Sequence, residues 1–216
     1  MTATTGTQAL EELVGELGIK AEADGAIDEL SLGVIGDFEF TNAKGGDAAA
    51  AAAITTRLNN VDGIFSSQLG IQITVNTIET FSSAAADPFT DQTDASLLLD
   101  EVSDYRSATP AQNSNGLTHL YTGKDLDGTT VGIAYTGALC SNFFGTGLSE
   151  GNASATFDSL VAAHEIGHNF GAPHDGEAGS ACEAEVGDWL MSPRLNGSDT
   201  FSQCSIDEMS DDIARA

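Results

Sequence analysis

Polar and apolar residues alternate along several short stretches of the chain, and this period of two predicts β-strands. Residues 30–40 alternate in this way and include β-branched and aromatic side chains, which predicts a first strand. Residues 71–75 predict a second strand by the same alternation, and two more short strands are predicted at residues 117–121 and 131–138. The chain therefore has four predicted strands, all in its first two thirds.

Five other stretches are predicted to be helical, and in two of them, residues 10–17 and 94–106, apolar residues recur at helical spacing. These stretches are residues 10–17, 47–62, 94–106, 155–170 and 206–214. The second is rich in alanine, with Asp47 expected to cap its first turn and Gly63 expected to stop it. Helices and strands thus alternate through much of the chain.

The order of these elements predicts an α/β (α+β) domain, in which helices pack on a mixed sheet. A length of 216 residues suits one domain with its own core. Residues 1–28 are predicted to lead into this domain, which would occupy residues 29–216. Beyond residue 170 the chain is rich in Gly, Asp and Ser, so little regular structure is expected before residue 206.

The net charge of the chain argues against two classes of binding partner. The chain has 33 acidic residues and only 7 Lys and Arg, which gives a formal charge of −26. Nucleic acids and anionic lipids bind basic surfaces, so neither is an expected partner. Two interpretations of the acidic residues stay open: a solubilising surface suited to salty surroundings, or a field that steers basic substrates to the protein.

No stretch of the sequence is apolar for long enough to span a membrane. The longest apolar run is residues 48–54, far short of the roughly 20 residues that a spanning helix needs. The N-terminus also lacks the basic start and apolar stretch of a signal peptide. If the protein is exported, its targeting segment is expected to have been removed already.

The strongest chemical signal is the sequence HEIGH at residues 164–168. On a helix, residues four apart leave the same face, so His164 and His168 can bind one metal ion. Glu165, beside the first histidine, can reach a water on that metal without binding the metal itself. The H-E-x-x-H pattern therefore predicts a zinc site with a general base.

The residues that follow extend this pattern. Gly171 can adopt the left-handed turn that ends the helix, and His174 lies three residues further on as a third ligand. Three protein ligands leave the fourth position of a tetrahedral zinc ion open for water, which is typical of a catalytic site. Met191, in the sequence WLMSP, resembles the methionine of the turn that runs beneath the metal in the metzincins.

These motifs resemble those of the metzincins, and within them the adamalysin (reprolysin) family, which includes the snake-venom metalloproteases and the ADAM and ADAMTS proteases. Asp175 after the third histidine, Pro193 after the methionine turn and the sequence FSQCS at residues 201–205 are similar to that family. The sequences VGIAYTGALC (131–140) and DFEF (37–40) resemble its edge strand and the end of its first strand. The resemblance covers about residues 29–210.

The resemblance implies a mostly parallel, twisted sheet, an active-site helix, an upper subdomain of about residues 29–171 and a small irregular lower subdomain of about residues 172–216. It also implies a secreted, monomeric zinc endopeptidase whose substrates are proteins or peptides. An extended peptide would pair with the edge strand at Gly132, Ile133 and Ala134. Calcium is a second candidate cofactor, with Glu39 from the first strand and Asp94 as candidate ligands.

Three cysteines, Cys140, Cys182 and Cys204, permit one disulfide, and the sequence alone leaves all three pairings open. The resemblance to the ADAMTS proteases implies that Cys182 pairs with Cys204 and that Cys140 is free.

Two other functions compete with a peptidase. A catalytically inactive relative could keep zinc and act as a binding or adhesion module, although such a protein is expected to lose its base, and Glu165 is intact. A zinc hydrolase that acts on a non-peptide amide would use the same chemistry. Turnover of casein or gelatin that a chelator blocks would distinguish a peptidase from both.

The charge predicts that salt stabilises the protein. At 0.01 M ionic strength the Debye length is about 30 Å, so carboxylates across the domain repel one another, whereas at 1 M it is about 3 Å. With zinc present throughout, the melting temperature is expected to rise between 0.01 and 1 M NaCl. A flat or falling melting temperature would show that the acidic groups are already paired or neutralised.

Overall fold

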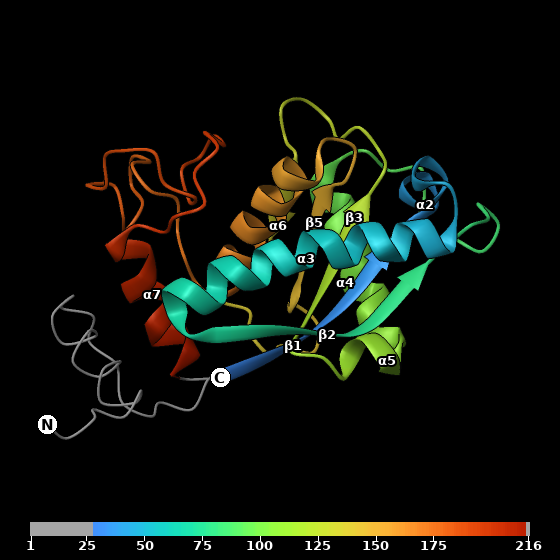
Figure 1. Ribbon diagram of the computed structural model, residues 1–216, viewed down its shortest axis with the longest axis horizontal. Coiled ribbons are helices and arrows are strands. Elements are labelled where there is room, and N and C mark those ends of the chain that lie inside the picture. Colours follow the sequence, from blue (N-terminus) through green and yellow to red (C-terminus); the bar gives the residue numbers. More distant parts are fainter. Residues whose placement is uncertain (1–27, 215–216) are drawn as a thin grey trace, which may run out of the picture.

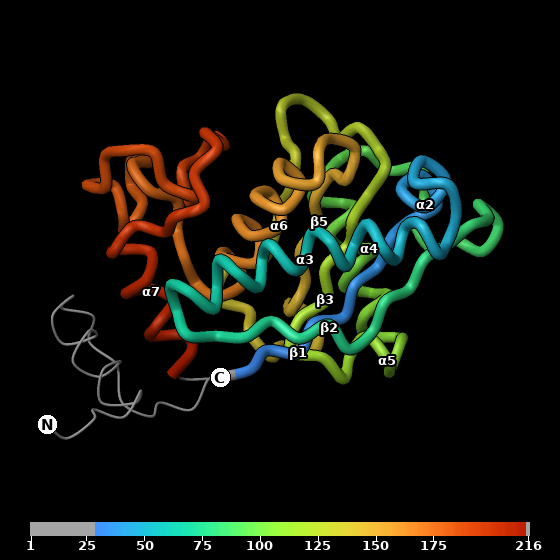
Figure 2. The backbone as a smooth tube through the Cα atoms, viewed as in Figure 1, coloured from blue at the N-terminus to red at the C-terminus, as the bar shows by residue number. Residues whose placement is uncertain are grey.

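The computed structural model describes residues 28–214, so the predicted helix at residues 10–17 lies outside the described residues. The backbone forms one sheet with helices packed on it (Figures 1 and 2). The elements in chain order are β1 (Asp28–Gly36), α2 (Phe38–Lys44), α3 (Asp47–Leu69), β2 (Ile71–Thr80), α4 (Ala95–Ala108), α5 (Pro110–Asn113), β3 (Leu117–Thr122), β4 (Gly132–Ala134), β5 (Thr146–Glu150), α6 (Ala155–Asn169) and α7 (Gln203–Ile213).

The sheet has the strand order β2-β1-β3-β5-β4. The first four strands in this order pair in parallel, and β4 pairs with β5 in the antiparallel direction at the edge. The predicted mixed, mostly parallel sheet is therefore confirmed. Helices connect β1 to β2 and β2 to β3, whereas β3 is connected to β5 by a long segment that contains β4 and no helix.

Alternation along the strands sends apolar side chains into two separate layers. Leu32 and Val34 of β1 pack in the larger core, with the apolar faces of α3 and α6. Ile35 of β1 points to the other face of the sheet, where it packs with residues of α4 such as Leu98 and Val102. Figure 1 shows α3 and α6 on one side of the sheet and α4 on the other. Both faces of the sheet are thus covered by helices.

The first strand ends earlier than predicted. Residues 30–40 were expected to be extended, but β1 stops at Gly36 and Phe38 begins the helix α2. Buried Asp37 caps this helix, because its Oδ1 accepts a hydrogen bond from the backbone N–H of Phe40 (2.8 Å). The sequence DFEF is therefore a cap and a first helical turn rather than the end of a strand.

The helix after it runs longer than predicted. Gly63 was expected to stop the alanine-rich helix, but α3 continues to Leu69 and ends at Gly70, which has a φ of 71°. Glycine inside a helix costs about 1 kcal/mol relative to alanine. Ile64 and Phe65, just after Gly63, are buried in the larger core, and this burial outweighs the cost.

The edge strand is shorter than predicted, and one strand was not predicted at all. β4 covers only residues 132–134 of the expected 131–138, because the chain turns at Gly137, which has a φ of 63°. β5 (Thr146–Glu150) is buried along most of its length, so it shows little alternation of polar and apolar residues. The other predicted helices at 94–106, 155–170 and 206–214 and the strand at 117–121 are confirmed to within a few residues. The strand predicted at 71–75 is also confirmed, but it continues to Thr80.

The chain between α6 and α7 has no helix or strand, as its composition predicted, and winds beside α7 (Figure 2). We propose that the domain divides into an upper subdomain of about residues 29–171 and a lower subdomain of about residues 172–216. No helix within residues 28–214 is both long enough and apolar enough to cross a membrane.

A buried ion pair joins α3 to the start of α6. The Nη2 and Nε atoms of Arg57 donate to Oδ2 of Asp158 at 2.6 and 3.0 Å, and both side chains are at least 95% buried. The other oxygen of Asp158 accepts the backbone N–H of Ala153, just before the helix. The pair therefore fixes the first turn of α6 against α3.

Because a buried carboxylate without its partner is costly, Arg57→Met is expected to lower the free energy of unfolding by about 3–5 kcal/mol. The double variant Arg57→Met/Asp158→Leu is expected to recover much of that loss, since it leaves no buried charge unpaired. Urea unfolding followed by circular dichroism measures both. A single variant within about 1 kcal/mol of the parent would contradict this role of the pair.

Candidate zinc site

The helix α6 carries two of the predicted ligands and the predicted base. Ser154 caps this helix by accepting the backbone N–H of Phe157, and the helix runs from Ala155 to Asn169. His164 and Glu165 are buried and His168 is half-buried. The two histidines are one helical turn apart and lie side by side, with a ring-centroid distance of 4.7 Å.

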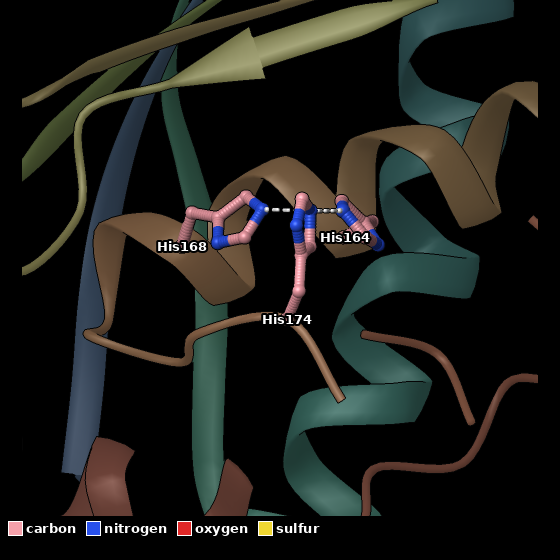
Figure 3. Close-up of side chains that lie close together, drawn as sticks. All are labelled: His164, His168 and His174. Carbon is pink, nitrogen blue, oxygen red and sulfur yellow. Dashed lines mark hydrogen bonds between the residues drawn. The ribbon is translucent and has the colours of Figure 1, made fainter. Parts of the chain in front are cut away.

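A glycine turn ends α6 and returns the chain to it. The N–H of Gly171 donates to the carbonyl of His168 (2.8 Å), and the N–H of Ala172 donates to the carbonyl of Gly167 (3.0 Å). These two bonds form a Schellman turn, which needs a left-handed residue, and Gly171 supplies it with a φ of 102°. The reversal lets His174 approach the other two histidines, as Figure 3 shows.

Each histidine ring is oriented by a bond from its Nδ1 atom. His164 Nδ1 lies 2.7 Å from the carbonyl oxygen of Leu190, and His168 Nδ1 lies 2.7 Å from that of Ala172. A carbonyl can only accept, so both Nδ1 atoms carry the proton and both Nε2 atoms carry a lone pair. The third ring has an acidic partner, because His174 Nδ1 lies 2.7 Å from a carboxylate oxygen of Glu177.

The three Nε2 atoms converge on one point. His174 Nε2 lies 3.3 Å from that of His164 and 3.1 Å from that of His168. With zinc–nitrogen bonds of about 2.0–2.1 Å, two ligands of a tetrahedral zinc ion lie about 3.3 Å apart. Three lone pairs facing one another repel unless a cation lies between them. The residues therefore fit a zinc ion, and within residues 28–214 they form the one group of three or more side chains able to hold a metal.

Burial also sets the protonation of the site. It lowers the pKa of His164 to about 4 and that of His168 to about 3, so both rings are neutral near pH 7 and able to bind a metal. Burial raises the pKa of Glu165 to about 8. A dication nearby would oppose this rise, because it stabilises the carboxylate form.

Met191 lies directly beneath α6. It is fully buried, and its Sδ atom is only 2.7 Å from the place where a side chain on Gly167 would begin. Residue 167 must therefore be glycine for the methionine turn to pack against the helix between the two histidines. The sequence analysis did not identify this role, although a glycine in the middle of a buried helix is a signal for a close contact.

Asp175 connects the third histidine to the C-terminal helix. Its backbone N–H donates to the carbonyl of Met191, and its Oδ1 accepts from the hydroxyls of Ser202 and Ser205 (2.7 and 3.1 Å). Asp175 is 3% exposed and both serines are fully buried. The sequence FSQCS therefore holds the loop that follows the third histidine.

A disulfide between Cys182 and Cys204 joins the same two segments. Cys140 is free and exposed. Of the three pairings that the sequence left open, the structure has the one that the resemblance implied.

The histidines and Glu165 lie in a cleft of about 1110 Å³. One side is lined by residues 129–134 and 136, which include β4, and the other by residues 173, 174, 177–180 and 192–195. β4 is the edge strand, so its outer side has no strand partner within residues 28–214. Gly132, Ile133 and Ala134, the predicted peptide-binding residues, thus lie on the cleft wall.

The structure places one of the two candidate calcium ligands, Glu39, on a different element from the one expected. Glu39 lies on α2 rather than on the first strand, and its Oε2 is 3.6 Å from Nζ of Lys124. Asp94 caps α4 by accepting the backbone N–H groups of Ser96 and Leu97. Each carboxylate therefore has a structural role of its own, and calcium binding stays a prediction.

The sequence of residues 29–202 matches the profile of a reprolysin family described as metallo-peptidase family M12. The chain is 33% identical over 165 residues to snake venom metalloproteinase TM-1 of Protobothrops mucrosquamatus, covering 73% of this chain and 79% of that protein. It is 31% identical over 123 residues to zinc metalloproteinase-disintegrin-like atrase-A of Naja atra, covering 56% of this chain and 20% of that protein. It is 38% identical over 94 residues to snake venom metalloproteinase acutolysin-C of Deinagkistrodon acutus. The chain spans about a fifth of these last two relatives (20% and 22%).

Glu177 is a further residue that the sequence analysis missed, and its contact with His174 generates a prediction. A carboxylate bonded to Nδ1 orients a histidine ligand and makes its other nitrogen a stronger donor to the metal. Glu177→Gln removes the charge, so it is expected to weaken zinc binding about tenfold, the low end of such effects because Glu177 is half exposed.

Competition with a chromophoric chelator measures the zinc affinity. The control is Glu208→Gln, which removes the same charge from the exposed surface of α7. Equal zinc affinities for the two variants would show that Glu177 does not support the ligand.

Proposed function

The chain belongs to metallo-peptidase family M12, and from this membership we propose that it is a secreted zinc endopeptidase in which Glu165 acts as the general base. The observation that carries the proposal is the convergence of three histidine Nε2 atoms beside a buried carboxylate in an open cleft. His164, His168 and His174 would hold the zinc. The chemistry that zinc supplies when bound is activation of a water molecule and polarisation of the scissile carbonyl.

Glu165 is placed to move the protons of this reaction. It follows His164 directly and lines the same cleft as the three histidines. Its carboxylate takes a proton from the attacking water and then gives that proton to the amine of the leaving peptide. Since no side chain forms a covalent bond to the substrate, the site needs no nucleophilic serine or cysteine. The free and exposed Cys140 has no part in the reaction.

The outer edge of β4 would hold the substrate in an extended conformation. Its unpaired N–H and C=O groups are available to a peptide strand, as in other cases of strand addition. A side chain on Gly132 would begin 2.6 Å from Oε1 of Glu165. A glycine there lets the substrate-binding edge and the base lie next to each other, which supports both roles in one site.

The alternative functions have less support. An inactive binding module has no need of a buried carboxylate beside three converging imidazoles, and this chain keeps all four groups. A hydrolase of small non-peptide amides has no need of an exposed strand edge along its cleft. Chelator-sensitive turnover of casein would distinguish the proposed activity from both.

We further propose that the protein acts outside the cell as a monomer on protein or peptide substrates. The relatives named as venom metalloproteinases support an extracellular location. A formal charge of −26 opposes self-association and the binding of nucleic acid. Zinc is the proposed resident metal, and calcium at Glu39 or Asp94 is a secondary proposal.

The role of Glu165 can be tested directly. Because general acid–base groups contribute about 10²–10⁴-fold to rates, Glu165→Ala is expected to lose at least about 100-fold in kcat on a peptide substrate. The variant is expected to keep its zinc, since Glu165 is not a ligand. Zinc content by mass spectrometry and kcat are measured on the same sample, with Glu208→Ala as the control. Turnover near that of the parent would remove Glu165 from the mechanism.

A further inference from the structure

Within residues 28–214, all but one of the cationic side chains are buried or half-buried. Five of its seven Lys and Arg residues lie in the described part of the chain. Arg57, Arg106 and Lys124 are buried, and Lys44 is half-buried. Arg194 alone among these five is exposed.

The four internal cations all have partners within the protein. The partners are Asp158 for Arg57, Asp37 and Glu39 for Lys124, the carbonyl oxygens of Gln112, Asn115 and Ser141 for Arg106, and the carbonyl oxygen of Gly151 for Lys44. In the described part of the chain, the side chain of Arg194 takes part in no ion pair or hydrogen bond. Its guanidinium group is therefore available to a ligand.

Arg194 lines the cleft that contains Glu165 and the three histidines. It is the one Lys or Arg among the residues that form this cleft. The remaining charged side chains there, Glu165 and Glu177, are acidic. An unpaired guanidinium in the wall of a cleft whose other charged side chains are acidic marks a place where a substrate carboxylate would find its only cationic side chain.

The loop that carries Arg194 is closed by its own hydrogen bonds. The side-chain amide of Asn196 donates to the carbonyl of Trp189 (3.3 Å) and to the hydroxyl of Ser192 (3.2 Å), and that hydroxyl also accepts the N–H of Trp189. Met191, within the same loop, is fully buried. The backbone of residue 194 is thus held against the cleft.

We propose that Arg194 is a specificity-determining residue, which selects peptides that place an Asp or Glu side chain in the cleft beside residues 192–195. This rests on the proposed peptidase function. A guanidinium group can bind a carboxylate through two parallel N–H···O bonds. A substrate peptide in the cleft would also exclude water from the pair and so strengthen it.

The net charge of the protein opposes the binding of the acidic peptides that Arg194 would favour. A charge of −26 repels acidic peptides at long range, whereas the contact with Arg194 is short-ranged. The Debye length is about 8 Å at 0.15 M ionic strength and about 3 Å at 1 M, so salt removes the repulsion before it removes a contact pair. A test must therefore use peptides of equal net charge.

The test is a set of isomeric peptides with one scissile bond. Each isomer has a single Glu, and Gln at all other scanned positions, so composition and net charge are the same in all. The ratio of kcat/KM between isomers is measured at 0.15 and 1 M NaCl for the zinc-loaded parent, Arg194→Gln and Arg194→Glu. Lys44→Gln is the matched control, because it removes one positive charge outside the cleft.

The parent is expected to favour Glu at one position by about two- to fivefold, the range for a partly exposed ion pair. Arg194→Gln is expected to abolish this preference, and Arg194→Glu to favour Lys at that position in a matching series, whereas Lys44→Gln keeps the preference of the parent. No positional preference in the parent, or a preference that persists in Arg194→Gln, would overturn the inference. Failure of the zinc-loaded parent to cleave any peptide would instead overturn the proposed function.

Discussion

The site depends on the reversal of the chain at Gly171. The turn brings His174 back to the two histidines of α6, and it also brings the carbonyl of Ala172 to the Nδ1 atom of His168. A side chain at residue 171 would meet both the left-handed φ of 102° and the carboxylate of Asp212, whose Oδ2 is 2.2 Å from the place of a new Cβ. One glycine thus determines the position of one ligand and the orientation of another.

The chain after α6, from residue 170 onwards, holds the three histidines in this arrangement. Its loops have no helix or strand, so their stability comes from particular contacts with α6 and with one another. Met191 packs on Gly167, the carbonyl of Leu190 accepts from His164, and Asp175 accepts from the two serines at the start of α7. The disulfide adds a covalent link between the same segments. The orientation of the histidine ligands therefore depends both on α6 and on the chain that follows it.

The positive and negative side chains have different places in the structure. Most of the few cations stabilise the interior, where Arg57 fixes the start of α6 and Arg106 donates to several carbonyl oxygens. This leaves the surface strongly acidic, which favours solubility and disfavours anionic partners. Arg194 differs from these residues because it lines the cleft. In the proposed role it binds an acidic side chain of the substrate, although the rest of the surface repels acidic peptides.

The sequence by itself determined the chemistry of this protein and most of its elements. The spacing of His164, Glu165, His168 and His174 identifies a zinc site, because a helix repeats every 3.6 residues and places residues four apart on one face. The sequence also located α3, α4, α6 and α7, though not their ends. Helices can be predicted from sequence because their caps and apolar faces depend on residues that are close along the chain.

Tertiary structure decided the features that depend on contacts between distant residues. Burial of Ile64 and Phe65 in the core extended α3 past Gly63. Asp37, which caps α2, is also bound by the hydroxyl of Thr122 and the backbone N–H of Gly123, far along the chain, so β1 ends earlier than its sequence predicted. β5 was not predicted because a strand buried on both faces has no alternating pattern. The contact of Met191 with Gly167 exists only after the C-terminal loops have folded back on α6. His174 and Glu177 are only three residues apart, but they lie outside helices and strands, where such a spacing implies no particular geometry. Such contacts have no fixed spacing along the chain, so only the folded structure could show them.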